Sequence, residues 1–233
     1  MKIYAISDLH LCSSGEKPME IFGGDWEDYT QKIYNDWQKK VRDGDVVLIC
    51  GDISWAMKIE QAKNDFKYFE NLKGNIVIIR GNHDYWWQSI SKVRNILPKG
   101  AYALQNDAIL LNDYVICGTR SWIVPENKLT NIQDNKIYKR ELLRLEMALT
   151  SANRLRKNNE TIICMLHYPP YNSNKEYNEI IKLLQDYNVK ICIFGHIHAC
   201  LGKYKIYEKL YGINFYLTSC DLLKNKLIEI KGE

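Results

Sequence analysis

The histidines of this 233-residue chain share one kind of position, because all five follow the end of a short apolar run. Each run has the length and the Val and Ile content of a buried β-strand. The runs end in five motifs: Asp8-Leu9-His10, Gly51-Asp52, Gly81-Asn82-His83-Asp84, His167 and Gly195-His196-Ile197-His198. Since open α/β sheets bind ligands at the carboxyl ends of their strands, we expect these side chains to converge.

Seven of these residues carry side chains that can bind metal ions: Asp8, His10, Asp52, Asn82, His167, His196 and His198. Carboxylate, imidazole and amide oxygen ligands suit Mn²⁺, Fe²⁺, Fe³⁺ or Zn²⁺. None of the positions is a cysteine, the ligand that structural zinc sites prefer. Seven ligands are more than one ion can bind while keeping coordination positions open for a substrate. They therefore predict two ions that share a carboxylate. Two metal ions about 3.5–4 Å apart serve displacement at phosphorus.

Each motif alone also has an explanation without a metal. A single histidine at a strand end is more often a hydrogen-bonded core residue than a ligand. Asp52 and Asp84 could cap helices, and Asn82 could be a turn residue. All of these explanations would have to hold independently. In extended chain, His196 and His198 point to the same side, so they could face one site or two adjacent metals.

The length and composition predict one domain over residues 1–233, because the motifs extend from residue 8 to residue 198 and must converge. Hydrophobic residues make up 46% and charged residues 26%, which is ordinary for a soluble globular protein. The net charge is +4, and positive and negative residues are interspersed along the chain. No basic block indicates nucleic acid as a partner, although the small positive excess would suit a phosphate-bearing substrate.

The seven cysteines include no C-x-x-C motif, and most lie in apolar runs. This pattern favours buried thiols in a reducing compartment over disulfides or a thiolate metal site. The N-terminus has no long apolar segment of a signal peptide, and no apolar stretch reaches the roughly 18 residues of a membrane span. We therefore expect a cytoplasmic protein without a membrane partner.

Hydrophobic periodicity predicts helices over 26–41, with Asp25 as a cap, and over 58–72, 85–96 and 136–157. Residues 108–117 read as a hairpin with its turn at Asn112-Asp113. The tail alternates like an antiparallel meander. The loops at 13–24 and 122–140 are candidates for a cap over the site. Helical crossovers and hairpins together predict an α/β protein.

The five motifs, in this order, resemble the pattern of the calcineurin-like metallophosphoesterase superfamily, and no position departs from it. The resemblance extends over most of the chain and is strongest to small bacterial predicted phosphohydrolases. It implies a four-layer α/β/β/α sandwich of two mixed sheets. It also implies hydrolysis of a phosphomonoester or phosphodiester by a hydroxide that bridges two metal ions. Mn²⁺ is the preferred metal, with Fe or Zn as alternatives.

The resemblance also implies a division of roles among the motif residues. Asp8, His10, Asp52 and His198 would hold one metal ion, and Asp52, Asn82, His167 and His196 the other. His83 would be the acid that protonates the leaving group, with Asp84 orienting it. General acid catalysis of this kind is worth roughly 10²–10⁴ in rate.

Two further residues are candidate substrate contacts. Trp86 follows the central motif and could stack on a base or aryl group, although packing within a helix is the favoured alternative. Arg120 could pair with a phosphate, and a surface salt bridge is an equal alternative. The substrate predicted here is a small phosphate ester, and the motifs do not specify which one. A nuclease, for which no basic stripe is evident, and a metal-free interaction scaffold are the alternative functions.

Overall fold

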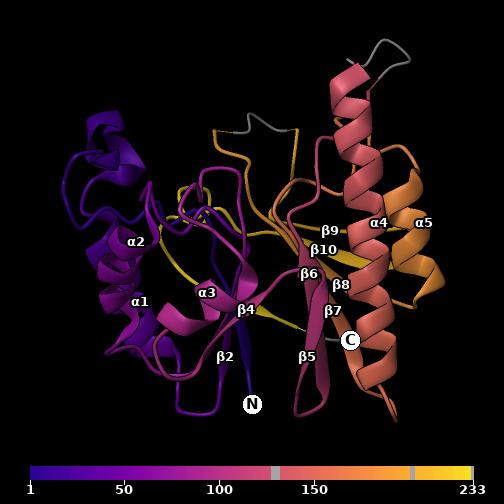
Figure 1. Ribbon diagram of the computed structural model, residues 1–233, viewed down its shortest axis with the longest axis horizontal. Helices are drawn as coiled ribbons and strands as arrows, with labels where there is room; N and C mark the ends of the chain where they lie inside the picture. Colours follow the sequence, from indigo (N-terminus) through magenta and orange to yellow (C-terminus); the bar gives the residue numbers. More distant parts are fainter. Residues whose placement is uncertain (127–131, 200–202, 232–233) are drawn as a thin grey trace.

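Two β-sheets lie face to face at the centre of the computed structural model, which describes residues 1–126, 132–199 and 203–231 (Figure 1). The first sheet has the order β11 (Ile228–Ile230), β1 (Ile3–Ala5), β2 (Val46–Ile49), β3 (Asn75–Ile79) and β4 (Ala101–Leu104). The second has the order β5 (Asp107–Leu111), β6 (Tyr114–Thr119), β7 (Thr161–Leu166), β8 (Ile191–Phe194), β10 (Ile213–Leu217) and β9 (Tyr207–Leu210). Both sheets are mixed: β11 is antiparallel at one edge of the first sheet, and β5 and β9 are antiparallel at the two edges of the second.

Helices cover the outer face of each sheet (Figure 1). On the side of the first sheet lie α1 (Tyr29–Lys40), α2 (Ile59–Asp65) and α3 (Ile90–Ile96), and on that of the second α4 (Ile132–Leu155) and α5 (Glu179–Asp186). Short 3₁₀ helices span Met19–Phe22, Gly24–Trp26 and Phe66–Phe69. The expected four-layer α/β/β/α sandwich is confirmed. None of the helices in the described ranges is long and apolar enough to cross a bilayer.

The central strands are largely apolar because both of their faces are covered, whereas the edge strand β9 alternates between exposed and partly buried residues. In β2, Val46 and Leu48 point into the core between the sheets, while Val47 and Ile49 pack under the helices. All four side chains are fully buried. Burial of such a side chain contributes about 1.5–3 kcal/mol relative to exposure, so the layers themselves hold the strand ends in place.

All four predicted helices begin or end at residues other than those expected, and the last of them, predicted over 136–157, spans Ile132–Leu155. The helix predicted from residue 26 begins at Tyr29, and Asp25 lies in a 3₁₀ turn where its carboxylate pairs with Lys224. The helix predicted over 58–72 ends at Asp65 and passes into a 3₁₀ turn. The helix predicted from residue 85 begins only at Ile90. Tertiary contacts outweigh local helix propensity at these ends.

The predicted hairpin is present, but part of the predicted cap at 122–140 is helical. Strands β5 and β6 form the predicted hairpin, and Asn112 adopts the left-handed backbone of a tight turn. In the predicted cap at 122–140, residues 132–140 belong to α4, which packs on β5 and β6, and residues 127–131 lie outside the described residues.

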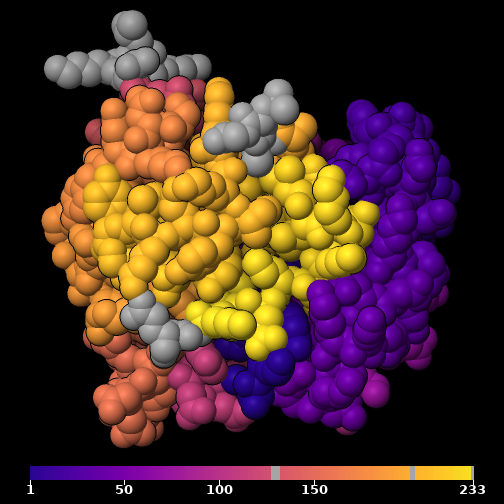
Figure 2. Space-filling model, turned by 180° about the vertical axis from the view of Figure 1, so that it is seen from behind, coloured from indigo at the N-terminus to yellow at the C-terminus, as the bar shows by residue number. Residues whose placement is uncertain are grey.

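The tail is not a simple meander. Strands β9 and β10 are antiparallel, as expected, but β11 crosses to the first sheet and pairs with β1. In Figure 2 this C-terminal part, in yellow, lies across the middle of the molecule between the indigo N-terminal part and the orange part of the second sheet. The chain therefore connects the two sheets a second time after β10.

The cysteines pack as small apolar residues. Cys117, Cys164 and Cys192 are buried side by side in register across β6, β7 and β8. The six cysteines of the described ranges are free thiols. Five of these six are buried, as predicted, and Cys12 is partly exposed.

Candidate metal centre

The ends of five parallel strands bring the motif residues together at one edge of both sheets. Asp8, His10, Asp52 and Asn82 follow strands of the first sheet, and His167, His196 and His198 follow strands of the second. The turns that hold them are unusual, because Asp8, His10, Asp52 and His196 have φ values of 59°, 44°, 51° and 69°. Non-glycine residues seldom adopt this left-handed backbone, and it recurs at functional sites.

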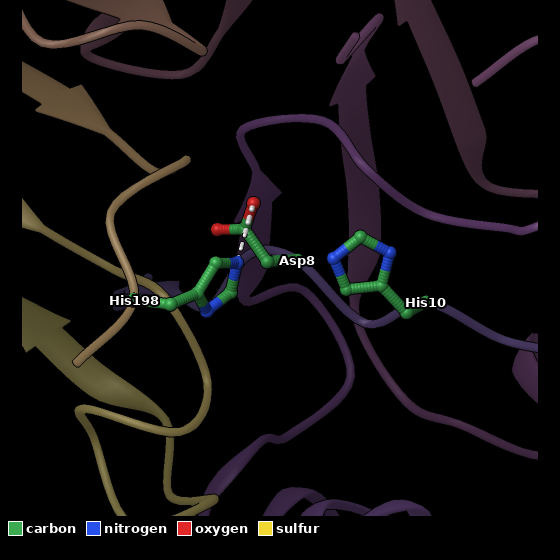
Figure 3. A group of neighbouring side chains, drawn as sticks. All are labelled: Asp8, His10 and His198. Carbon is green, nitrogen blue, oxygen red and sulfur yellow. Dashed lines mark ion pairs between the residues drawn. The ribbon is translucent and has the colours of Figure 1, made fainter. Parts of the chain in front are cut away.

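Asp8, His10 and His198 form the first group of candidate ligands (Figure 3). One potential ligand atom from each lies within 4.8 Å of those of the others. The His198 Nε2 atom is 3.8 Å from Asp8 Oδ1, and the His196 backbone N–H donates to both Asp8 oxygens. His10 Nδ1 is buried without a hydrogen-bond partner among the described residues. The other ring nitrogen, His10 Nε2, is the one that lies 3.9 Å from Asp52 Oδ2, and imidazole nitrogens facing carboxylates in such a cluster fit metal ligands.

Asp52, His167 and His196 form the second group, with the same spacing of ligand atoms. The buried Asp52 carboxylate lies between the two groups: its Oδ2 atom is 3.5 Å from His167 Nε2 and 3.9 Å from His10 Nε2. This position suits a carboxylate that binds two ions at once.

A hydrogen bond sets the orientation of the His167 ring in the way that a metal ligand requires. His167 Nδ1 lies 2.8 Å from the Cys50 carbonyl oxygen, an acceptor, so the proton of this imidazole belongs on Nδ1. The lone pair of His167 Nε2 then faces Asn82 Oδ1 at 2.6 Å. His167 Nε2 and Asn82 Oδ1 are then two acceptors in close contact, which fits a site that binds a cation. The residues present therefore fit the metal ions that the sequence predicts.

Glycines make the close approach of the turns possible. A Cβ atom on Gly81 would lie 2.1 Å from Asp52 Oδ1, and one on Gly195 would lie 2.5 Å from Asp8 Oδ2. A Cβ atom on Gly51 would meet the His167 ring at 2.9 Å. The glycines that precede the ligands therefore leave room for them.

The electrostatics of the cluster change the protonation of its members. Burial raises the pKa of Asp8 to about 8 and that of Asp52 to about 6. Burial and the neighbouring imidazoles lower the pKa of His196 to about 3. Burial is also the main cause that lowers the pKa of His167 to about 3. Neutral imidazoles at physiological pH are the form that binds metals.

We expect metal affinity to rise with pH between about 6 and 8, because protonated Asp8 must release its proton before it can bind an ion. Above pH 8 the Asp8 carboxylate is already charged and the gain ends. Calorimetric titration of EDTA-treated protein with Mn²⁺, in buffers of different ionisation enthalpy, measures both the affinity and the protons released. A pH-independent affinity without proton release would contradict these protonation states.

Asp221 was not singled out from the sequence, yet it positions a candidate ligand. Its Oδ1 atom is 2.9 Å from His198 Nδ1, which directs Nε2 of that ring toward Asp8. Burial alone would lower the pKa of His198, but the hydrogen bond to Asp221 and the charge of Asp8 raise it. A carboxylate behind a ligating histidine raises the basicity of the ligand. Asp221 also follows a strand, so the signal that marked the other motifs was present here.

The structure corrects the expectation that Asp84 orients His83. Within the described residues, no hydrogen bond joins the Asp84 carboxylate to the His83 ring. Asp84 instead accepts from the Trp86 indole N–H and from the backbone N–H groups of Gly81, Asp52, Ile53 and Ser54. Burial and the charge of Asp52 raise the pKa of Asp84 to about 7. Asp84 caps no helix and instead holds the turns after β2 and β3 against each other.

His83 stands beside the two groups without belonging to either. Its backbone N–H donates to Asp52 Oδ1 at 2.7 Å, and its Nδ1 atom lies 3.4 Å from the Tyr85 hydroxyl. Its ring faces the Trp55 ring, with centroids 4.6 Å apart. His83 thus borders the metal centre through its main chain while its ring stays out of the ligand set.

Trp86 does not form the stacking platform considered from the sequence. Its side chain is fully buried and packs edge-on against Phe66. The packing alternative is confirmed, although Trp86 lies in the turn before α3 and not in a helix. The wall of the metal centre is instead built from Met19, Phe22, Trp26 and Trp55, which line a cavity of about 350 Å³ with His83 and His198.

Arg120 lies in a partly buried position, not on an open surface. Its guanidinium carbon is 4.8 Å from the centre of the Trp122 ring, and its Nη2 atom is 3.8 Å from Glu141 Oε1. Its carbonyl oxygen accepts hydrogen bonds from the backbone N–H groups of His167 and Tyr168. Arg120 is therefore tied to the strand end that carries a candidate ligand.

Residues 1–200 match the family model described as calcineurin-like phosphoesterase. The chain therefore belongs to the calcineurin-like phosphoesterase family, and the resemblance drawn from the five motifs is confirmed. A stretch of 88 residues is 34% identical to MJ1445, an uncharacterised protein of Methanocaldococcus jannaschii, and covers 36% of this chain. The match spans 47% of the length of that relative.

Three solved structures share the fold. A phosphopantetheinyl hydrolase from Mycobacterium tuberculosis has a TM-score of 0.58 at 12% identity, with 100% of this chain and 96% of that chain covered. TT1561 of Thermus thermophilus has a TM-score of 0.57 at 14% identity, covering 98% and 97%. AQ665, a protein of unknown function from Aquifex aeolicus, has a TM-score of 0.51 at 15% identity, covering 98% and 95%.

Proposed function

We propose that this protein is a phosphohydrolase with a dinuclear metal centre that cleaves a small phosphomonoester or phosphodiester. The observation that carries the proposal is the position of the Asp52 carboxylate between two groups of candidate ligands. Asp8, His10 and His198 would hold one ion, and Asn82, His167 and His196 the other, with Asp52 shared. When bound, two such ions neutralise phosphoryl charge and lower the pKa of bound water.

The remaining side chains of the site would bind the leaving group and protonate it. His83 lines the same cavity as Phe22, Trp26 and Trp55 and is placed beside Asp52 by a main-chain hydrogen bond. A proton on its ring can reach a leaving oxygen that points into this cavity, which is general acid catalysis. The apolar wall favours a leaving group with an apolar or aromatic part.

Two alternative functions, a metal-free scaffold and a nuclease, fit the site less well. A metal-free scaffold has no need of left-handed turns that place four candidate ligands. A nuclease would act on the same bond type, but the wall of the cavity nearest the first group is aromatic and carries no lysine or arginine. A panel of small phosphate esters with single- and double-stranded nucleic acid distinguishes the phosphohydrolase from the nuclease.

We expect about two transition-metal ions per chain after loading with Mn²⁺, because two groups of ligand atoms are present. Elemental analysis of the dialysed protein measures the ratio of metal to chain. Circular dichroism on the same sample reports whether the fold is intact. Folded protein that retains no metal would exclude the dinuclear centre.

A further inference from the structure

Four arginines gather around a second cavity, of about 250 Å³, next to the metal centre. They are Arg80 after β3, Arg120 after β6, and Arg140 and Arg144 on α4. Polar side chains complete the lining, among them Gln105 and Thr119.

One carboxylate faces this positive charge. Glu141 is almost fully buried, and its Oε1 atom lies 2.6 Å from Arg144, 3.7 Å from Arg140 and 3.8 Å from Arg120. A single negative charge cannot balance four guanidinium groups. Arg80 adds to the excess, since its Nε atom is buried without a hydrogen-bond partner among the described residues. Buried donors of this kind are usually satisfied by a partner or a ligand.

The cavity borders the second group of candidate ligands. Arg80 precedes Gly81 and Asn82, and the Asn82 oxygen contacts His167. On the other side, the Arg120 carbonyl accepts hydrogen bonds from His167 and Tyr168. The arginine cavity is therefore joined through the main chain to the strand ends that carry Asn82 and His167, and it shares no lining residue with the aromatic cavity at Trp26 and Trp55.

We infer that the arginine cavity binds a second anionic group, a phosphate, of the substrate. This inference rests on the proposed function, since it names the class of ester that the site hydrolyses: one that carries a further phosphate besides the scissile one. Guanidinium groups bind phosphate oxygens through paired, charge-assisted hydrogen bonds, and four of them around one cavity match a dianion.

Phosphate binding tests the cavity separately from catalysis. We expect the full-length protein loaded with Mn²⁺ to bind two inorganic phosphates in a calorimetric titration, one at the metal centre and one at the arginines. The Arg80→Gln/Arg140→Gln variant should lose the second, with affinity reduced about tenfold or more. These two side chains make no hydrogen bond shorter than 3.5 Å in the described part of the chain.

Two controls separate the two sites. Arg154→Gln removes one positive charge, half of the change in the double variant, from an exposed position of α4 outside this cavity, and both phosphates should still bind. Asp52→Asn should lose the phosphate at the metal centre and keep the one at the arginines. If the Arg80→Gln/Arg140→Gln variant binds phosphate as the wild type does, the cavity is not an anion site. If the wild type binds phosphate only at the arginines and hydrolyses no ester, the proposed function fails while the cavity assignment stands.

A matched pair of esters tests whether the phosphate belongs to the substrate. Thymidine 5′-(p-nitrophenyl phosphate) and its 3′-phosphorylated form share a scissile bond and a leaving group. The wild type should prefer the 3′-phosphorylated ester, and the ratio of the two kcat/KM values should fall about tenfold or more in Arg80→Gln/Arg140→Gln. An unchanged ratio, with phosphate binding lost, would show that the cavity holds free phosphate and not part of the substrate.

Discussion

We expect Asp52→Asn to lose nearly all of the proposed hydrolytic activity and to lower metal occupancy at both positions. The Asp52 carboxylate lies 3.5 Å from His167 and 3.9 Å from His10, so the amide removes a charged oxygen from both groups at once. A metal ion supplies several kcal/mol of transition-state charge stabilisation. Because about 1.4 kcal/mol corresponds to tenfold, we expect kcat to fall by about 10³ or more. Steady-state kinetics and elemental analysis measure the two effects.

Asp113→Asn is the matched control for this substitution. Asp113 lies in the exposed turn of the β5–β6 hairpin, so the same change of carboxylate to amide there should leave kcat and metal content unchanged. Asp52→Asn protein that retains two ions at wild-type affinity would show that Asp52 does not bridge them. Loss of one ion alone would assign Asp52 to a single site.

His83→Ala lowers kcat by roughly 10²–10⁴ on esters with poor leaving groups while metal content stays near the wild-type level. The reason is structural: the main-chain N–H of residue 83, which donates to Asp52, remains in the variant, and only the ring is lost. A nitrophenyl phosphate needs little protonation of its leaving oxygen, so its hydrolysis should be slowed much less. The measurement is kcat for an alkyl and a nitrophenyl ester, in both proteins.

The comparison of the two esters decides between roles for His83. An equal loss on both would mean that the ring stabilises the phosphoryl group and does not donate the proton. A loss of metal would place His83 among the ligands, against its position outside both groups. The ratio of the two losses does not depend on the fraction of active enzyme, so partial misfolding of the variant cannot mimic the expected result.

The motif residues could be identified from sequence because their signal is local. A buried strand, a glycine and a chelating side chain follow one another within a few residues at Gly51-Asp52 and Gly81-Asn82, and the edge of a parallel sheet brings such ends together. The layer order followed from the family resemblance, which the family match now supports.

Other features depend on contacts between distant segments and had no local signal. Asp84 accepts hydrogen bonds from residues about thirty positions earlier, at Asp52, Ile53 and Ser54, so its role could not be read from its neighbour His83. Trp86 is covered by Phe66 from another segment. The arginine cavity joins side chains from β3, β6 and α4. In each case the partner became visible only once the chain was folded.

The pairing of β1 with β11 also has a consequence for how the protein folds. The two strands bring together residues as distant as Lys2 and Glu229, 227 positions apart, and β1 has no other neighbour on that side. Until β11 arrives, β1 presents an open edge of unpaired backbone groups, the kind of edge that recruits strands from other chains. Contacts of such sequence separation also form slowly. Nascent chains are therefore most prone to associate with one another before β11 has emerged, and a chaperone that shields the β1 edge would act at that moment.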